Sequence, residues 1–460
     1  MPTSTSTPTP TLPVTTGPVV QPGEDGYEAA RRGYNLSVVH HPVVVFSVAD
    51  VEDVVTAVRY AAEHALPVAV QATGHGPTAP ADGAVLVNTA RMNTIEVDPA
   101  TRTARFGAGV RSGDLVHAAA EHGLAPLNGS APAVGAVSYH LGGGIGMLSR
   151  QFGYAADHVR AMDVVTADGQ LRHVTAQQEP DLFWALRGAG KGRFGIVVAM
   201  EIDLHPVTRL HGGGMHFSAE TTAEVLHTYS AWAATAPEQM GSSVLLMHMP
   251  DVDGVPAELR GRFLSHLRFA YTGSPDEGER LVRPFRDLAP LTDTVAEMPY
   301  SDVGTIHNEP TTPVAFHARN SILDTLNTDA VDTLLSHAGP DAGAPYLVEL
   351  RHLGGALARP STMPNALSRR DGQFCLYSGS AVANADEIAP LHSALGRLHY
   401  AMAPWGTGGV CLNFLAGPDV TDEQLRSAYL PTDLARLTRI NREIDPTNTF
   451  RINHSRTLGR

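Results

Sequence analysis

The chain has 460 residues, of which 43% are hydrophobic and 17% are charged, so it is long enough for two lobes around one site. Its 33 Lys and Arg against 47 Asp and Glu give a formal net charge of −14, which argues against binding to the phosphate backbone of nucleic acids. Lys191 is the only lysine, so mechanisms that need a lysine base or a Schiff base have almost no candidate residue.

The N-terminal residues 1–23 are rich in Thr, Pro and Ser, with no basic start and no apolar core. They predict a disordered tail rather than a signal peptide. No run approaches the roughly 20 apolar residues that a membrane span needs, so no membrane partner is expected. The two cysteines, Cys375 and Cys411, form no C-x-x-C pair and cannot make a disulfide framework. Such cysteine usage fits a reducing cytoplasm.

Strand and helix patterns alternate after the tail. They lie at residues 27–33 (helix), 41–46 (strand), 47–64 (helix, with Ser47 as N-cap and Asp50 nearby), 66–70 (strand) and 83–88 (strand). Between the last two strands lies the loop 71–77, in which Gly74 and Gly76 flank His75. These glycines let a large planar or phosphorylated ligand approach the backbone closely. Taken alone, the loop is better explained by a turn histidine that bonds a nearby carbonyl.

A second glycine-rich stretch spans residues 128–146, after strand patterns at 94–97 and 103–109 and a helix pattern at 112–122. So many glycines in one loop cost conformational entropy unless the backbone must bend or approach a ligand. We therefore predict a binding cleft lined by backbone. Val134, Leu141 and Ile145 are spaced to anchor this loop, although they are equally compatible with plain core positions.

A third glycine cluster, from Gly190 through Gly192 and Gly195 to Val197, matches both the dinucleotide fingerprint G-x-G-x-x-G and the kinase glycine loop. Both motifs require a strand before the glycines, whereas here a helix pattern precedes them and a strand pattern at 196–204 follows. No V-A-I-K, H-R-D or D-F-G sequence follows. We therefore reject a kinase and a Rossmann fold, and leave open a phosphate contact by these backbone amides.

The pattern of apolar residues changes after Pro206. Longer apolar segments at 242–249, 266–271 and 345–352 alternate with helix patterns at 221–234 and 276–288. This pattern predicts an antiparallel sheet with one covered face in a second lobe. An amphipathic helix is predicted at 421–444. We find no internal repeats and no H-E-x-x-H or C-x-x-C spacing, so no metal site is predicted.

From about residue 27 to its C-terminus the chain resembles the berberine-bridge-enzyme-like flavoprotein oxidases, within the vanillyl-alcohol-oxidase type of FAD fold. The motifs that carry the resemblance, in chain order, are Gly74-His75-Gly76, Pro132-Ala-Val-Gly135 with Leu141-Gly-Gly-Gly144, Ala156-Asp157-His158-Val159, Asp181-Leu-Phe-Trp184 with Arg187-Gly188, Phe194-Gly195-Ile-Val197 and Asp445-Pro-Thr-Asn-Thr-Phe-Arg-Ile-Asn453. It implies an α+β fold, and it places the chain with the bacterial members that hold their flavin by a single covalent bond. A PCMH-type FAD-binding domain would cover 24–207, a substrate domain 208–415, and a C-terminal segment 416–460 would return to the FAD domain.

The resemblance also implies FAD between the two lobes, with its diphosphate on the loop 71–76. His75 matches the histidine that bonds covalently to the flavin 8α-methyl group, and Ala131 stands where many relatives carry a second, cysteinyl tether. Gly129 matches a small residue that leaves molecular oxygen a path to the flavin. The remaining implied cofactor contacts are Gln71, Ala72, Thr73, Gly74, Gly76, Ser130, Val134, Gly135, Ser138, Leu141, Gly142, Gly143, Gly195, Val197, Asn413 and Asn453.

This chain departs from the family pattern at two places. Val137-Ser138 replaces a Gly-Gly pair, and the Ser138 hydroxyl could bond the flavin or simply satisfy the loop. The motif Tyr-x-Asn reads Cys411-Leu412-Asn413, so the tyrosine often used as base is missing.

A base must therefore come from elsewhere. Glu349 is the first candidate, because a carboxylate among apolar neighbours should have a raised pKa. Its alternative is an ion pair with Arg351 on the same strand face. Further candidates are Tyr139, His140, Tyr300 and His352, each of which is better explained by a structural or substrate-shaping role. The catalytic residues proposed from the sequence are Glu349, Tyr139 and Ser138.

The expected function is a flavoprotein oxidase that dehydrogenates an alcohol, amine or phenolic carbon of a specialised metabolite and passes the electrons to O2. A sparse-lysine, Ala/Gly/Pro/Arg-rich composition hints at a high-GC bacterium and at antibiotic tailoring. The alternative is an enzyme that inserts oxygen during polyketide tailoring, as in the enterocin pathway. A non-catalytic ligand-binding relic ranks last. A monomer or homodimer is expected, with a small-molecule substrate and O2 as partners.

Overall fold

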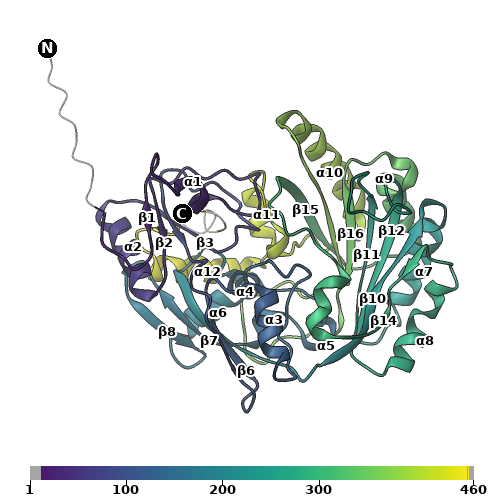
Figure 1. The fold of residues 1–460 in the computed structure, drawn as a ribbon, viewed down its shortest axis with the longest axis horizontal. Helices are drawn as coiled ribbons and strands as arrows, with labels where there is room; N and C mark the ends of the chain where they lie inside the picture. Colours follow the sequence, from purple (N-terminus) through teal and green to yellow (C-terminus); the bar gives the residue numbers. More distant parts are fainter. Residues whose placement is uncertain (1–11, 453, 455–460) are drawn as a thin grey trace.

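The computed structural model describes residues 12–452 and 454, and Figure 1 shows that they form two lobes. The first lobe holds the N-terminal elements, drawn from purple to blue, together with the C-terminal helices in yellow-green. The second lobe holds the teal and green middle of the chain. Along the described residues, no helix combines the length and apolar composition that crossing a membrane requires.

The small sheet of the first lobe has the order β1-β2-β4-β3 and consists of β1 (Val19–Val20), β2 (Val44–Ser47), β3 (Val68–Gln71) and β4 (Val85–Asn88). The short helix α1 (Tyr27–Arg31) precedes β2, and helix α2 (Val51–Glu63) packs its buried face on the sheet. β2, β3 and β4 pair in parallel. Because parallel neighbours cannot be joined by a hairpin, the segment after β3 must cross the end of the sheet, and this segment carries His75.

Two predictions near the N-terminus are wrong. Helix α2 is capped by Asp50, whose carboxylate accepts the backbone N–H of Asp53, whereas Ser47 is the last residue of β2. The tail predicted for 1–23 is ordered in its described part, because the Asp53 carboxylate accepts the backbone N–H groups of Thr16 and Gly17 and β1 pairs with β2. Residues 1–11 lie outside the described residues.

The second sheet of the first lobe is antiparallel and has the order β5-β6-β9-β7-β8. Its strands are β5 (Ile95–Asp98), β6 (Thr103–Gly107), β7 (Val159–Val165), β8 (Leu171–Thr175) and β9 (Ile196–Asp203). Helices α3 (Ser112–Ala120), α4 (Ala136–Leu141) and α6 (Pro180–Ala189) lie along this part of the chain, whereas the short helix α5 (Ser149–Phe152) contacts the second lobe. Helix α4 corrects the prediction of a continuous loop over 128–146, since the six residues between Gly135 and Gly142 are free of glycine and all but Ser138 are buried.

The second lobe is built on an antiparallel eight-stranded sheet of order β13-β10-β12-β11-β16-β17-β15, in which β14 also pairs with β10. Its strands are β10 (Arg209–Ser218), β11 (Met240–His248), β12 (Phe263–Tyr271), β13 (Thr292–Asp293), β14 (Ala296–Pro299), β15 (Phe316–Leu323), β16 (Leu347–His352) and β17 (Phe374–Ala381). Helices α7 (Thr222–Ala233), α8 (Pro275–Arg286), α9 (Thr328–Ala338) and α10 (Ile388–Met402) cover one face (Figure 1). The predicted α+β class and covered antiparallel sheet are confirmed.

Alternation along β16 separates the two faces of this sheet. Val348 and Leu350 lie in the core beneath the helices, so Glu349 and Arg351 point the opposite way, toward the first lobe. The strand thereby places two charged side chains at the junction of the lobes.

The C-terminal segment returns to the first lobe as two helices, α11 (Asp422–Ser427) and α12 (Pro431–Ile444), instead of the single helix predicted over 421–444. Pro431 opens α12, where its missing N–H costs no helical hydrogen bond. Arg436 of α12 lies 4.0 Å above the ring of Trp184 in α6. This contact helps to fasten the segment to the first lobe.

Candidate functional site

A cavity that opens to solvent lies where the two lobes meet. The segment 69–77 after β3, the stretch 129–145, the third glycine cluster and parts of the second lobe and C-terminal segment all line it. Because this lining comes from both lobes, a ligand bound in the cavity would contact both of them.

Most of the residues proposed from sequence are brought together here. Those that line the cavity are Gln71, Ala72, Thr73, Gly74, His75, Gly76, Gly129, Ser130, Val134, Gly135, Ser138, Tyr139, Leu141, Gly195, Val197 and Asn413. Gly142 lines a smaller neighbouring cavity, Gly143 lines neither, and Asn453 lies outside the described residues. Glu349 lies behind the cavity wall.

His75 is held as a neutral imidazole. Its ring stacks on Tyr34 at 3.9 Å, and its Nδ1 lies 2.8 Å from the Thr73 hydroxyl. Burial lowers the pKa of His75 to about 4, aided by the positive charges of Arg111 and Lys191. Its buried Nε2 has no hydrogen-bond partner among residues 12–452 and 454. A neutral ring with one unengaged nitrogen is suited to nucleophilic attack on a bound group.

At two glycines the wall of the cavity consists of backbone without a side chain. Gly74 has φ +70°, and a Cβ there would lie 2.5 Å from the Cα of Gly33. Gly195 has φ +139°, and a Cβ there would lie 2.6 Å from the Val165 carbonyl oxygen. Both positions demand glycine, and they leave the neighbouring amides of the wall accessible.

Lys191 is a positively charged group in the cavity that sequence reasoning did not propose as a contact. Its side chain is buried, and burial lowers its pKa to about 8, so it is still mainly charged at neutral pH. A Cβ added to Gly76 would lie 3.1 Å from its Nζ, which places the ammonium against the loop of His75. An anionic group on that loop would meet this charge.

Tyr139 and Asn413 meet on another wall of the cavity. The Asn413 amide donates to the Tyr139 carbonyl oxygen at 2.8 Å. The Tyr139 hydroxyl is buried without a partner among the described residues, and burial raises its pKa, so the phenol remains protonated. It can therefore donate a hydrogen bond to a ligand, and the raised pKa disfavours Tyr139 as a base. A Cβ on Gly129 would lie only 3.1 Å from this ring.

The expectation that Glu349 has a raised pKa is wrong. Burial alone would raise it, but Arg351, His307 and Arg268 hold the pKa of Glu349 well below its ordinary value. The carboxylate accepts from Arg268 at 3.0 Å and from Arg351 at 2.9 Å, and His307 Nε2 lies 3.3 Å away. The ion pair with Arg351 considered from the sequence is present, and two partners from distant segments complete the cluster.

Three further candidates for the base also have close polar partners. The Tyr300 hydroxyl donates to the Pro126 carbonyl oxygen at 2.8 Å, and His140 Nδ1 lies 2.8 Å from the Ala136 carbonyl oxygen. His352 Nε2 lies 2.8 Å from Arg150 Nη1. These contacts give each side chain a structural role.

A chain of polar groups that no sequence spacing indicated leads out of the cavity. The Ser130 hydroxyl accepts from Arg351 Nη2 at 3.0 Å and donates to Glu309 Oε1 at 2.9 Å. Arg351 also lies 4.9 Å above the Phe414 ring, and both residues line the cavity. The carboxylate of Glu309 is partly exposed, so a proton that reaches Ser130 can pass toward solvent.

This donor set fits FAD better than a smaller ligand. A buried ammonium beside glycine-flanked amides suits a diphosphate, and a neutral histidine with an unengaged nitrogen suits a bond to the ring system. The side of the cavity toward the second lobe carries Arg351, Phe414 and Ser130, which are suited to a small organic substrate.

Comparison with known proteins supports this assignment. A family model described as an FAD binding domain matches residues 42–175. (R)-6-hydroxynicotine oxidase from Paenarthrobacter nicotinovorans is 28% identical over 95% of this chain and 96% of its own. The solved structure of 6-hydroxy-D-nicotine oxidase from Arthrobacter nicotinovorans matches with a TM-score of 0.83 at 26% identity, covering 96% of this chain and 98% of that one. Berberine bridge enzyme from Eschscholzia californica shares the fold, with a TM-score of 0.80 at 20% identity over 95% and 96% of the two chains.

Proposed function

The chain belongs to the berberine-bridge-enzyme-like FAD-linked oxidases, and we propose that it oxidises a carbon bearing an amine or hydroxyl group in a small molecule, with His75 holding the flavin covalently and O2 as electron acceptor. FAD is its cofactor and oxidoreduction its chemistry, as the sequence predicts. The observation that carries the finer proposal is His75, neutral, stacked and with one unengaged ring nitrogen inside the cavity.

Bound FAD supplies the two-electron acceptor, and the protein must place the substrate and remove its proton. In the overall reaction the substrate loses two hydrogen atoms to become an imine or a carbonyl compound. O2 gains these two hydrogen atoms and becomes hydrogen peroxide. A relative that is named a nicotine oxidase favours an amine among the substrate classes.

We assign proton removal to the chain of Ser130 and Glu309. The Ser130 hydroxyl already donates to Glu309 and accepts from Arg351, so its second lone pair is free to accept an N–H or O–H of the substrate. As that proton arrives, the serine proton passes to Glu309. Arg351 fixes the serine in this orientation and faces any negative charge on the substrate. Glu349, which is fully paired behind the wall, holds Arg351 in place.

An oxygen-inserting reaction is the competing function. The observation that favours it is Cys411, which occupies the position of the family tyrosine, so the usual base is absent. The two functions differ in the fate of the oxygen atoms, since an oxidase returns both of them as peroxide.

An oxygen-balance experiment tests the proposal. Purified protein is supplied with a panel of cyclic amines, aromatic alcohols and phenols under ¹⁸O2. We expect one hydrogen peroxide per product and no ¹⁸O in the product. Incorporation of ¹⁸O into the product would establish the oxygen-inserting reaction instead. A substrate that reduces the flavin anaerobically but is not turned over under O2 would contradict the choice of acceptor.

Lys191 should bind the diphosphate of FAD. In a His75→Ala background the cofactor is held by non-covalent contacts alone, so its dissociation constant can be measured. Adding Lys191→Met should raise that constant for FAD by about 10-fold or more, because a hydrogen bond from a charged donor is worth about 1.5–3 kcal/mol. The constant for riboflavin, which lacks the diphosphate, should stay unchanged, and Lys191→Arg should retain most FAD affinity. Equal weakening of both ligands would assign Lys191 to the shape of the cavity instead.

A further inference from the structure

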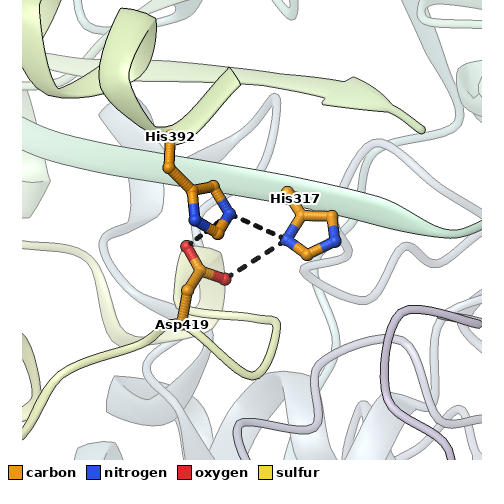
Figure 2. A group of neighbouring side chains, drawn as sticks. All are labelled: His317, His392 and Asp419. Atoms are coloured by element: carbon orange, nitrogen blue, oxygen red, sulfur yellow. Dashed lines mark hydrogen bonds and ion pairs between the residues drawn. The ribbon is translucent and has the colours of Figure 1, made fainter. Parts of the chain in front are cut away.

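Three metal-ligating side chains meet outside the flavin cavity, and Figure 2 shows that they point toward one another. They are His317, His392 and Asp419. His392 Nε2 lies 3.0 Å from His317 Nδ1 and 3.2 Å from Asp419 Oδ2, while His317 Nδ1 lies 3.4 Å from Asp419 Oδ1. Asp419 uses a different oxygen in each of its two contacts, and one ligand atom from each residue lies within 4.8 Å of the others.

Each of the three side chains comes from a different segment. His317 lies on β15, the edge strand of the large sheet, and His392 lies on α10. Asp419 lies in the loop before α11, where the chain turns back to the first lobe. His317 and His392 are 75 positions apart in the sequence and His392 and Asp419 are 27 apart, so no local motif accounts for their meeting.

The separations match those of ligands around one ion. Zinc binds His nitrogen at about 2.0–2.1 Å and carboxylate oxygen at about 2.0–2.2 Å, so neighbouring ligand atoms in tetrahedral or octahedral sites lie roughly 3.0–3.5 Å apart. Two imidazoles and one carboxylate form a ligand set that divalent transition metals favour. A fourth position would be left for water.

The protein environment also suits a bound cation. His317 is buried, while His392 and Asp419 have side chains only 24% and 17% exposed. Asp419 Oδ1 is buried, and apart from its 3.4 Å contact with His317 inside the cluster it has no hydrogen-bond partner among the described residues. Arg319 lies two residues from His317 on the same face of β15. Its positive charge repels a bound cation and limits the affinity of the site for the metal.

We propose that His317, His392 and Asp419 bind one divalent transition-metal ion, with zinc as the probe. The ion ties the edge strand of the second lobe and α10 to the returning C-terminal segment. Two residues before Asp419, the backbone N–H of Gly417 donates to the Pro77 carbonyl oxygen at 2.8 Å, and Pro77 lines the flavin cavity next to the His75 loop. The metal therefore fixes a segment that braces the cofactor loop from outside.

Zinc binding to the full-length flavoprotein tests this proposal. The protein is dialysed against a chelator, the chelator is removed, and zinc is titrated by calorimetry with metal analysis of the saturated sample. We expect one zinc per chain and a rise in the unfolding temperature, since a ligand that binds only the folded state stabilises it. His392→Gln and Asp419→Asn should each weaken zinc binding roughly 100-fold or more and abolish the thermal shift.

His122→Gln is the matched control, because His122 is exposed and remote in sequence from the cluster. It should leave the tightest zinc site intact. The flavin spectrum and circular dichroism of each variant report its folding, and the buried His317 is left unchanged for that reason. The proposal is overturned if wild-type protein shows no saturable zinc site, if both His392→Gln and Asp419→Asn retain it, or if His122→Gln removes it.

Discussion

Replacing His75 with Ala should release the flavin from the protein. The wild-type protein should stay yellow after acid precipitation, with its colour in the pellet, because a covalent bond survives unfolding. The variant should either lose its colour or release flavin into the supernatant. Visible spectra of pellet and supernatant, together with mass spectrometry of the intact chain, measure the result. The physical basis is the neutral ring of His75, whose unengaged nitrogen lies inside the cavity.

Tyr34→Leu is a useful companion, since it removes the stacking partner and keeps the imidazole. Flavin should still attach covalently in this variant, although more slowly, because the ring is less well oriented. Flavin that remains in the pellet of His75→Ala would place the tether on another residue. Flavin released freely from wild-type protein would remove the covalent bond from the proposal and leave the FAD assignment intact.

The two carboxylates beside Arg351 should respond to neutralisation in opposite ways. Glu349→Gln should destabilise the protein by about 3–5 kcal/mol, because it leaves the buried guanidinium groups of Arg268 and Arg351 without their shared counterion. Glu309→Gln, at a partly exposed position, should scarcely change stability but should lower kcat by roughly 100-fold through loss of the proton acceptor. Urea unfolding and steady-state kinetics on the same preparations separate the two effects.

The pH dependence of stability provides a second check on Glu349. Its carboxyl has a folded pKa below the ordinary value of 4.5, so its stabilising contribution is complete above the pKa of the unfolded chain. That contribution disappears as the pH falls through the lower, folded pKa. The difference in unfolding midpoint between wild type and Glu349→Gln should therefore shrink as the pH drops below about 4.5. A stable Glu349→Gln variant with greatly reduced kcat would instead make Glu349 the base.

The sequence was most informative where a local backbone requirement reveals itself in consecutive residues. Gly74 and Gly195 take up backbone conformations with positive φ, and both belong to glycine clusters that stand out in the sequence. In the second lobe the apolar segments at 242–249, 266–271 and 345–352 correspond to β11, β12 and β16, and the helix patterns at 221–234 and 276–288 correspond to α7 and α8. Helix α4 was missed because the glycines on both sides of it resemble a loop.

Electrostatics were harder to foresee, since they depend on segments far apart in the chain. The low pKa of Glu349 comes from Arg268 and His307 as well as from its near neighbour Arg351. The link from Ser130 to Glu309 joins positions with no shared motif. His317, His392 and Asp419 escaped a search for metal motifs for the same reason, because only the folded chain brings them together.

The alternation along the large sheet has a consequence for how this protein can change. On β16, Val348 and Leu350 hold the helices, whereas Glu349 faces the first lobe in one row with Leu245 of β11 and Tyr377 of β17. Odd and even positions of a single strand thus serve separate purposes. Substitutions in the row that holds Leu245 and Tyr377 can therefore alter the junction of the lobes, while the packing beneath the helices of the second lobe stays untouched.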